Sequence, residues 1–229
     1  MGACGAATVR LLADGSAIVR SGTQDIGTGT YTIMAQVAAD ALGLPVARVT
    51  AELGDSAMSQ APVSGGSQTA TSVMRAVHAA ARDVRDQLVA LAINAAGGKL
   101  GGARPDDVDI ADGALFLTSD PSGREAIGIV LSRADHEAIE ATRDAKKYGM
   151  HAFGAHFAEV RVDAELGEVR VTRYVGAFVA GRILNPKTAR SQAIGGIVYG
   201  LGMALTEETH VDRRSGRVAN ANMPSISCR

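Results

Sequence analysis

A long segment, residues 67–96, carries a stripe of apolar side chains, and this stripe limits what the chain can fold into. Apolar residues recur every three or four positions, and Gly97 and Gly98 follow directly, which is the pattern of an amphipathic helix with a glycine stop. A helix of this kind is stable in a protein mainly because its apolar face is packed. The sequence therefore predicts a long helix over a core, with a buried stripe of Val73, Val77, Ala80, Ala81, Val84, Leu88 and Leu91.

That core must be built from small side chains. Alanine supplies 41 of the 229 residues, whereas Phe and Tyr supply four each and Trp is absent. Backbones therefore have to approach one another closely, because few bulky rings are available to fill space.

Charge and patterning exclude several classes of protein. The net charge of −1 leaves no basic footprint for nucleic acid. No apolar run is long enough for a membrane span, and the first residues lack the pattern of a secretory signal. Cys4 and Cys228 offer neither a disulfide framework nor metal-ligand spacing. We expect a cytoplasmic chain that holds no metal directly through its own side chains, with export to the periplasm beside a partner subunit as the alternative.

Hairpins and helices come in blocks rather than in strict strand–helix–strand alternation, which is typical of an α+β fold with hairpin-rich sheets packed against long helices. A charged run at 133–147 is predicted to be a solvated helix or a linker. The other expected elements are strands 8–12, 17–21 and 48–53, a helix 30–42 capped by Thr28 or Thr30, a small hairpin within 108–117, two long strands between 148 and 180, and a helix 187–206 containing four glycines.

The segment 24–32 joins a predicted strand to a predicted helix through two glycines. Free amides at a helix N-terminus can hold an anion, most simply a phosphate. The segment is not a dinucleotide fingerprint, because Thr32 stands at the third glycine position, and no Walker loop is present. An ordinary glycine turn is the alternative, and it is favoured when this segment is taken alone.

A second segment, 62–69, also runs into the start of a long helix through small residues and hydroxyls. Ser64, Gly65, Gly66 and Ser67 can wrap a phosphate or the polar edge of a ring, and Ser67 can equally be the N-cap of the helix. Because two such loops occur in one chain, we expect both helix N-termini to face one extended anionic ligand. A third candidate is Gln192 near the start of the glycine-rich helix, for which a surface glutamine is an equally good interpretation.

A series of motifs occurs in an order that is far more specific than any one of them. The chain resembles the molybdopterin-binding large subunit of the xanthine dehydrogenase and aldehyde oxidoreductase family, and is most similar to its bacterial aldehyde oxidoreductase-type members. The similarity covers residues 7–96 and 148–222 and is weak over 97–147. The motifs are Asp25-Ile-Gly-Thr-Gly-Thr, Gln36-Val-Ala-Ala-Asp-Ala-Leu-Gly-Leu-Pro45, Ser64-Gly-Gly-Ser67, Gly154-Ala-His-Phe-Ala-Glu-Val-Arg-Val-Asp163, Gly181-Arg-Ile-Leu-Asn-Pro186, Gln192-Ala-Ile-Gly-Gly196 and Gly200-Leu-Gly-Met-Ala-Leu-Thr-Glu-Glu208.

The resemblance implies the fold of that family's second molybdopterin-binding domain. It divides the chain into a first half (1–98), a variable insert or linker (99–147), a second half (148–222) and a tail (223–229). The implied cofactor is molybdopterin with molybdenum, in the cytosine dinucleotide form common in bacteria. Its implied contacts are Gly27, Thr28, Gly29, Ser64, Gly65, Gly66 and Ser67, with Gln192 near the molybdenum.

The implied reaction is the hydroxylation of an aldehyde or N-heterocycle (purine-like) carbon with oxygen from water. Electrons would leave through the pterin to [2Fe-2S] clusters and FAD on partner subunits. The family's catalytic glutamate base is expected beyond residue 229, so the resemblance implies no catalytic residue within this chain. The chain resembles only part of the C-terminal half of the family's large subunit, and the earlier cofactor and substrate segments are missing from it. The alternative function is a non-catalytic decayed or split-gene fragment that acts only as an assembly module. A generic phosphate-ligand domain is a third, weaker one.

Two positions depart from the family pattern. Val179 stands where an acidic residue is expected. The last residues, Pro-Ser-Ile-Ser-Cys-Arg at 224–229, match an out-of-frame reading of codons for the expected Ala-Glu-Tyr-Leu-Val-Pro. We therefore hypothesise a one-base frameshift near codon 223, which the nucleotide sequence can confirm or refute.

Overall fold

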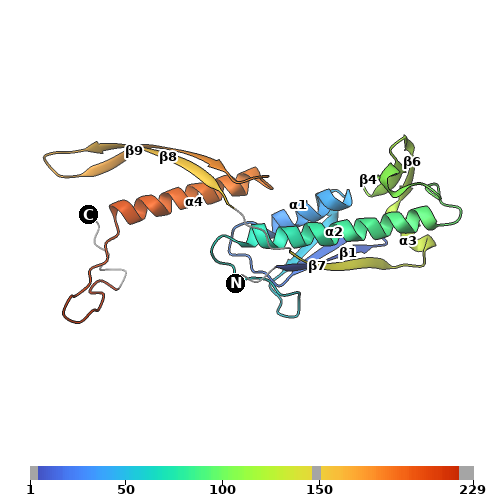
Figure 1. The fold of residues 1–229 in the computed structure, drawn as a ribbon, viewed down its shortest axis with the longest axis horizontal. Helices are drawn as coiled ribbons and strands as arrows, with labels where there is room; N and C mark the ends of the chain where they lie inside the picture. The colour runs from blue at the N-terminus through green and yellow to red at the C-terminus, as the bar shows by residue number, and fades with distance from the viewer. Residues whose placement is uncertain (1–4, 146–150, 222–229) are drawn as a thin grey trace. The chain divides into compact units, whose positions relative to one another are not determined.

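The structure, a computed structural model, describes residues 5–145 and 151–221 (Figure 1). The chain divides into two compact units, Met1–Tyr148 and Gly149–Arg229. Each unit is described by itself. Both sheets and helices are present in each, so the predicted α+β class is confirmed. The tail hypothesis falls on residues outside the described part.

The first unit is built on a four-stranded sheet with the order β3-β2-β1-β7. Strands β1 (Ala6–Leu12) and β2 (Ala17–Ser21) form the predicted antiparallel hairpin, whose turn places Gly15 at a left-handed φ of 78°. Strand β3 (Val49–Leu53) pairs parallel with β2, and β7 (Ala138–Asp144) pairs antiparallel with β1.

Two helices pack against this sheet and against each other, α1 (Thr30–Leu42) and α2 (Thr69–Asn94) (Figure 1). Between α1 and β3 lies a short 3-10 turn, η1 (Val46–Arg48). The predicted stripe of α2 is confirmed: its members are buried except Leu91, which is half-buried against the same core. The residue before β1 approaches α2 closely because it is a glycine. A Cβ on Gly5 would lie 3.1 Å from Val73 Cγ2.

The prediction of a solvated helix or linker at 133–147 is wrong for the described residues. Residues 138–144 form β7, with Ile139 and Ala141 buried toward the core. The alternation has period two, as in a strand with one buried face, but charged residues on the exposed face disguise it. This part of the chain is therefore integral to the sheet and does not connect domains.

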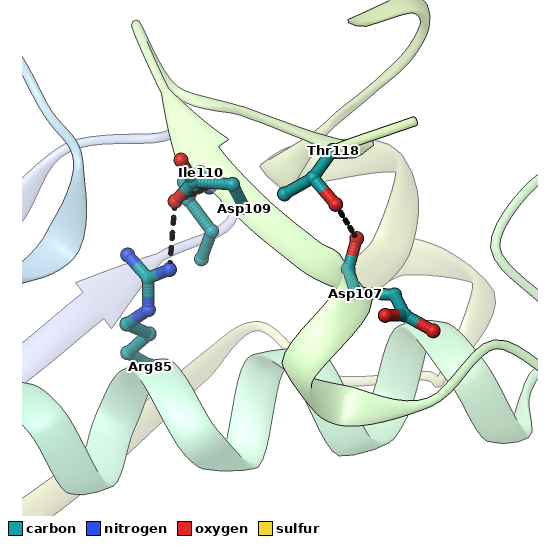
Figure 2. A network of polar contacts seen from close by, with 5 residues as sticks. All are labelled: Arg85, Asp107, Asp109, Ile110 and Thr118. Atoms are coloured by element: carbon teal, nitrogen blue, oxygen red, sulfur yellow. Dashed lines mark hydrogen bonds and ion pairs between the residues drawn. The ribbon is translucent and has the colours of Figure 1, made fainter. Parts of the chain in front are cut away.

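A smaller sheet, β4-β5-β6, completes the unit. Arg85 on α2 donates a hydrogen bond of 2.8 Å to Asp109 of β4 (Figure 2), and this contact holds the pKa of the Asp109 carboxyl below its usual value. Glu125, which is 4% exposed, forms an ion pair with Arg133. The elements here are η2 (Pro105–Asp107), β4 (Val108–Ala111), β5 (Ala114–Leu117), β6 (Asp120–Ala126) and α3 (Ile127–Arg133).

The second unit contains a long antiparallel hairpin, β8 (Phe153–Val162) and β9 (Val169–Val179), and the helix α4 (Pro186–Leu205). Asn185 caps α4, since its Oδ1 accepts hydrogen bonds from the backbone N–H groups of Lys187 and Thr188 at 3.1 and 3.2 Å. These elements confirm the predicted strands and helix. Among the described residues of this unit, none is buried. Across the described chain, every helix is too short or too polar to cross a bilayer.

Candidate functional site

The structure brings the two predicted loops into direct contact. The first loop (residues 22–29) leaves β2, and the second loop (residues 54–68) leaves β3. Ser64 Oγ donates to Gln24 Oε1 at 2.7 Å and to the Gln24 carbonyl at 3.2 Å. The Gly22 N–H donates to the Ser59 carbonyl at 2.8 Å. Segments some forty residues apart in sequence therefore share one end of the sheet.

The first loop enters α1 through left-handed glycines, Gly27 at φ 86° and Gly29 at φ 85°. Gly29 is the N-cap of α1, and no side chain caps the helix. The predicted capping by Thr28 or Thr30 is wrong, because the turn ends on glycine and leaves Thr30 buried within the helix. Gly27 is exposed, with no atom within 4 Å of where a Cβ would stand.

The second loop enters α2 through two successive left-handed residues, Gly66 at φ 64° and Ser67 at φ 54°. Gln68 is the N-cap and makes no side-chain capping bond, so the prediction that Ser67 caps the helix is wrong. The left-handed backbone at Ser67 ends the loop one residue before the cap. Gly65 and Gly66 are exposed and face open space.

The chemistry of these loops is that of hydrogen-bond donors around an anion. Both helix N-termini lack a side-chain cap and have no acidic residue in their first turn. Uncapped first-turn amides and the helix dipole favour negative charge. The nearby carboxylate of Asp25 accepts a 2.7 Å hydrogen bond from the Gly27 N–H. The Gly27 N–H is therefore already occupied, and a phosphate or the polar edge of a ring fits the donors that remain at the two helix starts.

Gln192 lies on α4 in the second unit. It lines a groove of about 620 Å³ together with His156, Tyr174 and Phe178. His156 Nδ1 lies 3.0 Å from the Tyr174 hydroxyl, and its ring meets Phe178 edge-on with centroids 5.1 Å apart. A side-chain amide beside aromatic rings can bind a flat heterocycle.

Sequence reasoning missed Gln24, Gly22 and Ser59 as residues that organise the loops. Gly22 is required by close packing, since a Cβ there would lie 2.7 Å from the Ser59 carbonyl oxygen. Gln24 begins the segment that was singled out, but its partner Ser64 lies far along the chain. No local spacing encodes such a contact.

Val179, where the family pattern predicts an acid, is 68% exposed and stands opposite Phe153 in the β8–β9 register. Phe157 and Val175 are opposed in the same way four residues along. Because side chains alternate across a strand, these four apolar residues share one face of the hairpin. The apolar residue at 179 is thus consistent with its immediate neighbours.

Comparison with known proteins identifies the family. The family described as "Molybdopterin cofactor-binding domain" matches residues 2–226. The chain is 40% identical over 218 residues to the aldehyde oxidoreductase molybdenum-binding subunit PaoC of Escherichia coli (strain K12), covering 95% of this chain and 28% of that protein. It is 32% identical over 220 residues to the nicotine 6-hydroxylase large subunit of Paenarthrobacter nicotinovorans, covering 90% and 26%.

Among solved structures, quinoline 2-oxidoreductase from Pseudomonas putida 86 superposes with a TM-score of 0.84 at 26% identity, over 99% of this chain and 30% of that one. The chain thus spans less than a third of the length of these relatives. The family match covers nearly the whole chain, including both loops and Gln192. The chain therefore belongs to the molybdopterin cofactor-binding domain family.

Proposed function

We propose that the chain forms part of the cradle for molybdopterin in a molybdenum-dependent oxidoreductase. Gly27, Thr28 and Gly29 of the first loop and the 64–67 stretch of the second loop would contact the cofactor. The observation that carries the proposal is the Ser64–Gln24 contact, which holds two glycine-rich loops together at two uncapped helix starts. Such an arrangement offers donors to one ligand from both sides.

The cytosine dinucleotide form of the cofactor suits this arrangement, because it is extended and carries phosphate charge. When bound, the cofactor supplies the oxidative hydroxylation of a carbon with oxygen from water. The chain's own residues bind and orient the cofactor, and Gln192 would offer its amide to the ligand from α4. Relatives named for aldehydes, nicotine and quinoline support an aldehyde or an N-heterocycle as the substrate class.

The partners we propose are the remainder of a large subunit, an iron–sulfur subunit and an FAD subunit, in the cytoplasm. The chain matches 28% of the length of PaoC, and no residue is assigned here as the catalytic base.

In the second unit, Phe153 and Phe157 are 74% and 69% exposed on one face of the hairpin. Apolar faces of this kind are normally covered by other polypeptide. We therefore propose catalysis only for the assembled enzyme.

Cofactor retention tests the proposal. The chain is co-expressed with the remaining large-subunit polypeptide in a host that makes molybdopterin. The purified complex is assayed for molybdenum by mass spectrometry and for pterin by the fluorescence of its oxidation product. Gly65→Leu should abolish retention, because Gly65 faces open space in the protein and a leucine there meets only the ligand. The control is Gln60→Leu, an exposed position in the same loop.

Other outcomes distinguish the alternatives. A complex that assembles but contains neither molybdenum nor pterin would favour the non-catalytic assembly module. Saturable binding of a simple nucleotide without molybdenum would favour a generic phosphate-ligand domain. Equal retention by Gly65→Leu and Gln60→Leu would refute the placement of the cofactor at these loops.

A further inference from the structure

We propose that Gln24 and Ser64 form a clasp that sets the spacing of the two loops, and that Ser64 is a positioning residue rather than a contact to the ligand. This inference rests on the proposed function for the identity of the ligand. The clasp itself rests on contacts in the first unit. The proposal changes the role of Ser64 from a ligand contact to a positioning residue, and it adds Gln24 as its partner.

The geometry of the clasp is fully specified on both sides. Ser64 Oγ donates to Gln24 Oε1 at 2.7 Å and to the Gln24 carbonyl at 3.2 Å. The Gln24 amide nitrogen in turn donates to the Gly22 carbonyl at 3.3 Å. That bond orients the amide so that its oxygen faces Ser64. A side-chain amide suits this pair of roles, because it supplies an acceptor and a donor on one planar group.

The single hydroxyl proton of Ser64 is committed to Gln24. A serine hydroxyl has one proton to donate, so Ser64 cannot also donate to an anionic oxygen while the clasp is closed. An anion needs donors. The Gly65 N–H already donates to the Val63 carbonyl at 2.8 Å, so the donors that remain exposed are the Gly66 amide and the residue Ser67. The structure therefore separates a residue that holds the loop from residues that face the ligand.

The clasp is the second of two fastenings on the same loop. The first consists of backbone hydrogen bonds, from the Gly22 N–H to the Ser59 carbonyl at 2.8 Å and from the Ala6 N–H to the Gln60 carbonyl at 3.0 Å. Beyond Ser64 the chain reaches the start of α2 at Thr69. The exposed residues 65–67 are thus held by Ser64 on one side and by the start of α2 on the other. Beyond Gln60, Ala61 packs against the core and Pro62 is buried. Without the clasp, the following residues would be held chiefly by the hydrogen bond from Gln68 Nε2 to the Val63 carbonyl at 3.2 Å.

Hydrogen exchange of the full chain without cofactor tests the clasp directly. Gln24→Met, Ser64→Ala and the double variant are compared with Gln60→Met as the matched control. Each single variant should speed exchange over 62–68 about fivefold, the effect expected for losing one hydrogen bond of ordinary strength. The double variant should exchange no faster than Ser64→Ala, because Ser64→Ala already removes both hydrogen bonds from Ser64 to Gln24. Exchange in Gln24→Met equal to that in Gln60→Met, or additive effects in the double variant, would overturn the clasp.

Pterin content of the co-expressed complex separates positioning from ligand contact. Gln24→Met should lower pterin content, and Ser64→Ala, which also removes the bond to the Gln24 carbonyl, should lower it at least as far. Ser64→Thr, which keeps the hydroxyl, should retain the wild-type content. A loss in Ser64→Ala without a loss in Gln24→Met would make Ser64 a ligand contact and refute its positioning role. A wild-type complex without pterin would refute the proposed function, while the exchange experiment would still decide whether the clasp exists.

Discussion

Gly22→Ala is the perturbation that bears most directly on the loops. A Cβ at Gly22 would lie 2.7 Å from the Ser59 carbonyl oxygen, whereas ordinary contact begins near 3.4 Å. Ser59 must therefore retreat by about 0.7 Å, which takes its 2.8 Å hydrogen bond to the Gly22 N–H out of effective range. Losing that bond costs about 1 kcal/mol, and overpacking of a tight backbone contact adds about 1–3 kcal/mol.

We expect Gly22→Ala to lower the free energy of unfolding of the first unit by about 2–4 kcal/mol. Hydrogen exchange of β1 and α2 amides across a urea series measures this unit alone. The control is Gly65→Ala, where a Cβ meets no atom within 4 Å and the change should stay within about 0.5 kcal/mol. If the two alanine variants unfold at the same urea concentration, the Gly22–Ser59 contact does not hold the second loop.

Three further predictions concern other parts of the fold. Arg133→Met should cost about 3 kcal/mol because it leaves the buried Glu125 carboxyl without its cation, and adding Glu125→Gln should recover most of that loss in urea unfolding. The pKa of Asp109 is lowered by its hydrogen bond from Arg85, so its contribution to stability is present above about pH 4 and lost as pH falls through the lowered pKa; Asp109→Asn should flatten the acid limb of a pH–stability curve. Gly195→Ala should raise the stability of α4 by about 1 kcal/mol, because a Cβ there meets nothing within 4 Å. A decrease in helix content measured by circular dichroism would contradict it.

Elements with strong local signals were predictable nearly to the residue. The helix predicted at 30–42 coincides with α1 because left-handed glycines, Gly29 and Gly43, bound it on both sides. The parallel strand at 49–53 and the long hairpin of the second unit also carry clear period-two patterns. In each case the signal lies within the element and needs no distant partner.

The misses have two physical causes, which are partners distant in sequence and left-handed backbone at the starts of the helices. Strand β7 has a short, charge-masked pattern and becomes a strand only by pairing with β1, where Ala141 lies opposite Val9. The capping predictions failed because the loops turn on left-handed residues, Gly29 and Ser67. A distant partner also hid Gln24, whose role depends on a contact with Ser64.

The two units support their site residues to different degrees, and the difference follows from burial. The loops of the first unit rest on a sheet and helices with a continuous buried core, so a contact such as Gln24–Ser64 has fixed surroundings. In the described part of the second unit no side chain is buried, although Phe153 and Phe157 alternate on β8 as core residues do. A two-stranded hairpin with one helix is marginal without further packing, and α4 places Gly196 and Gly200 against open space. Glycines within a helix are costly unless another backbone or a ligand approaches them. The glycines of α4 therefore indicate a helix that packs closely against a further backbone or a ligand.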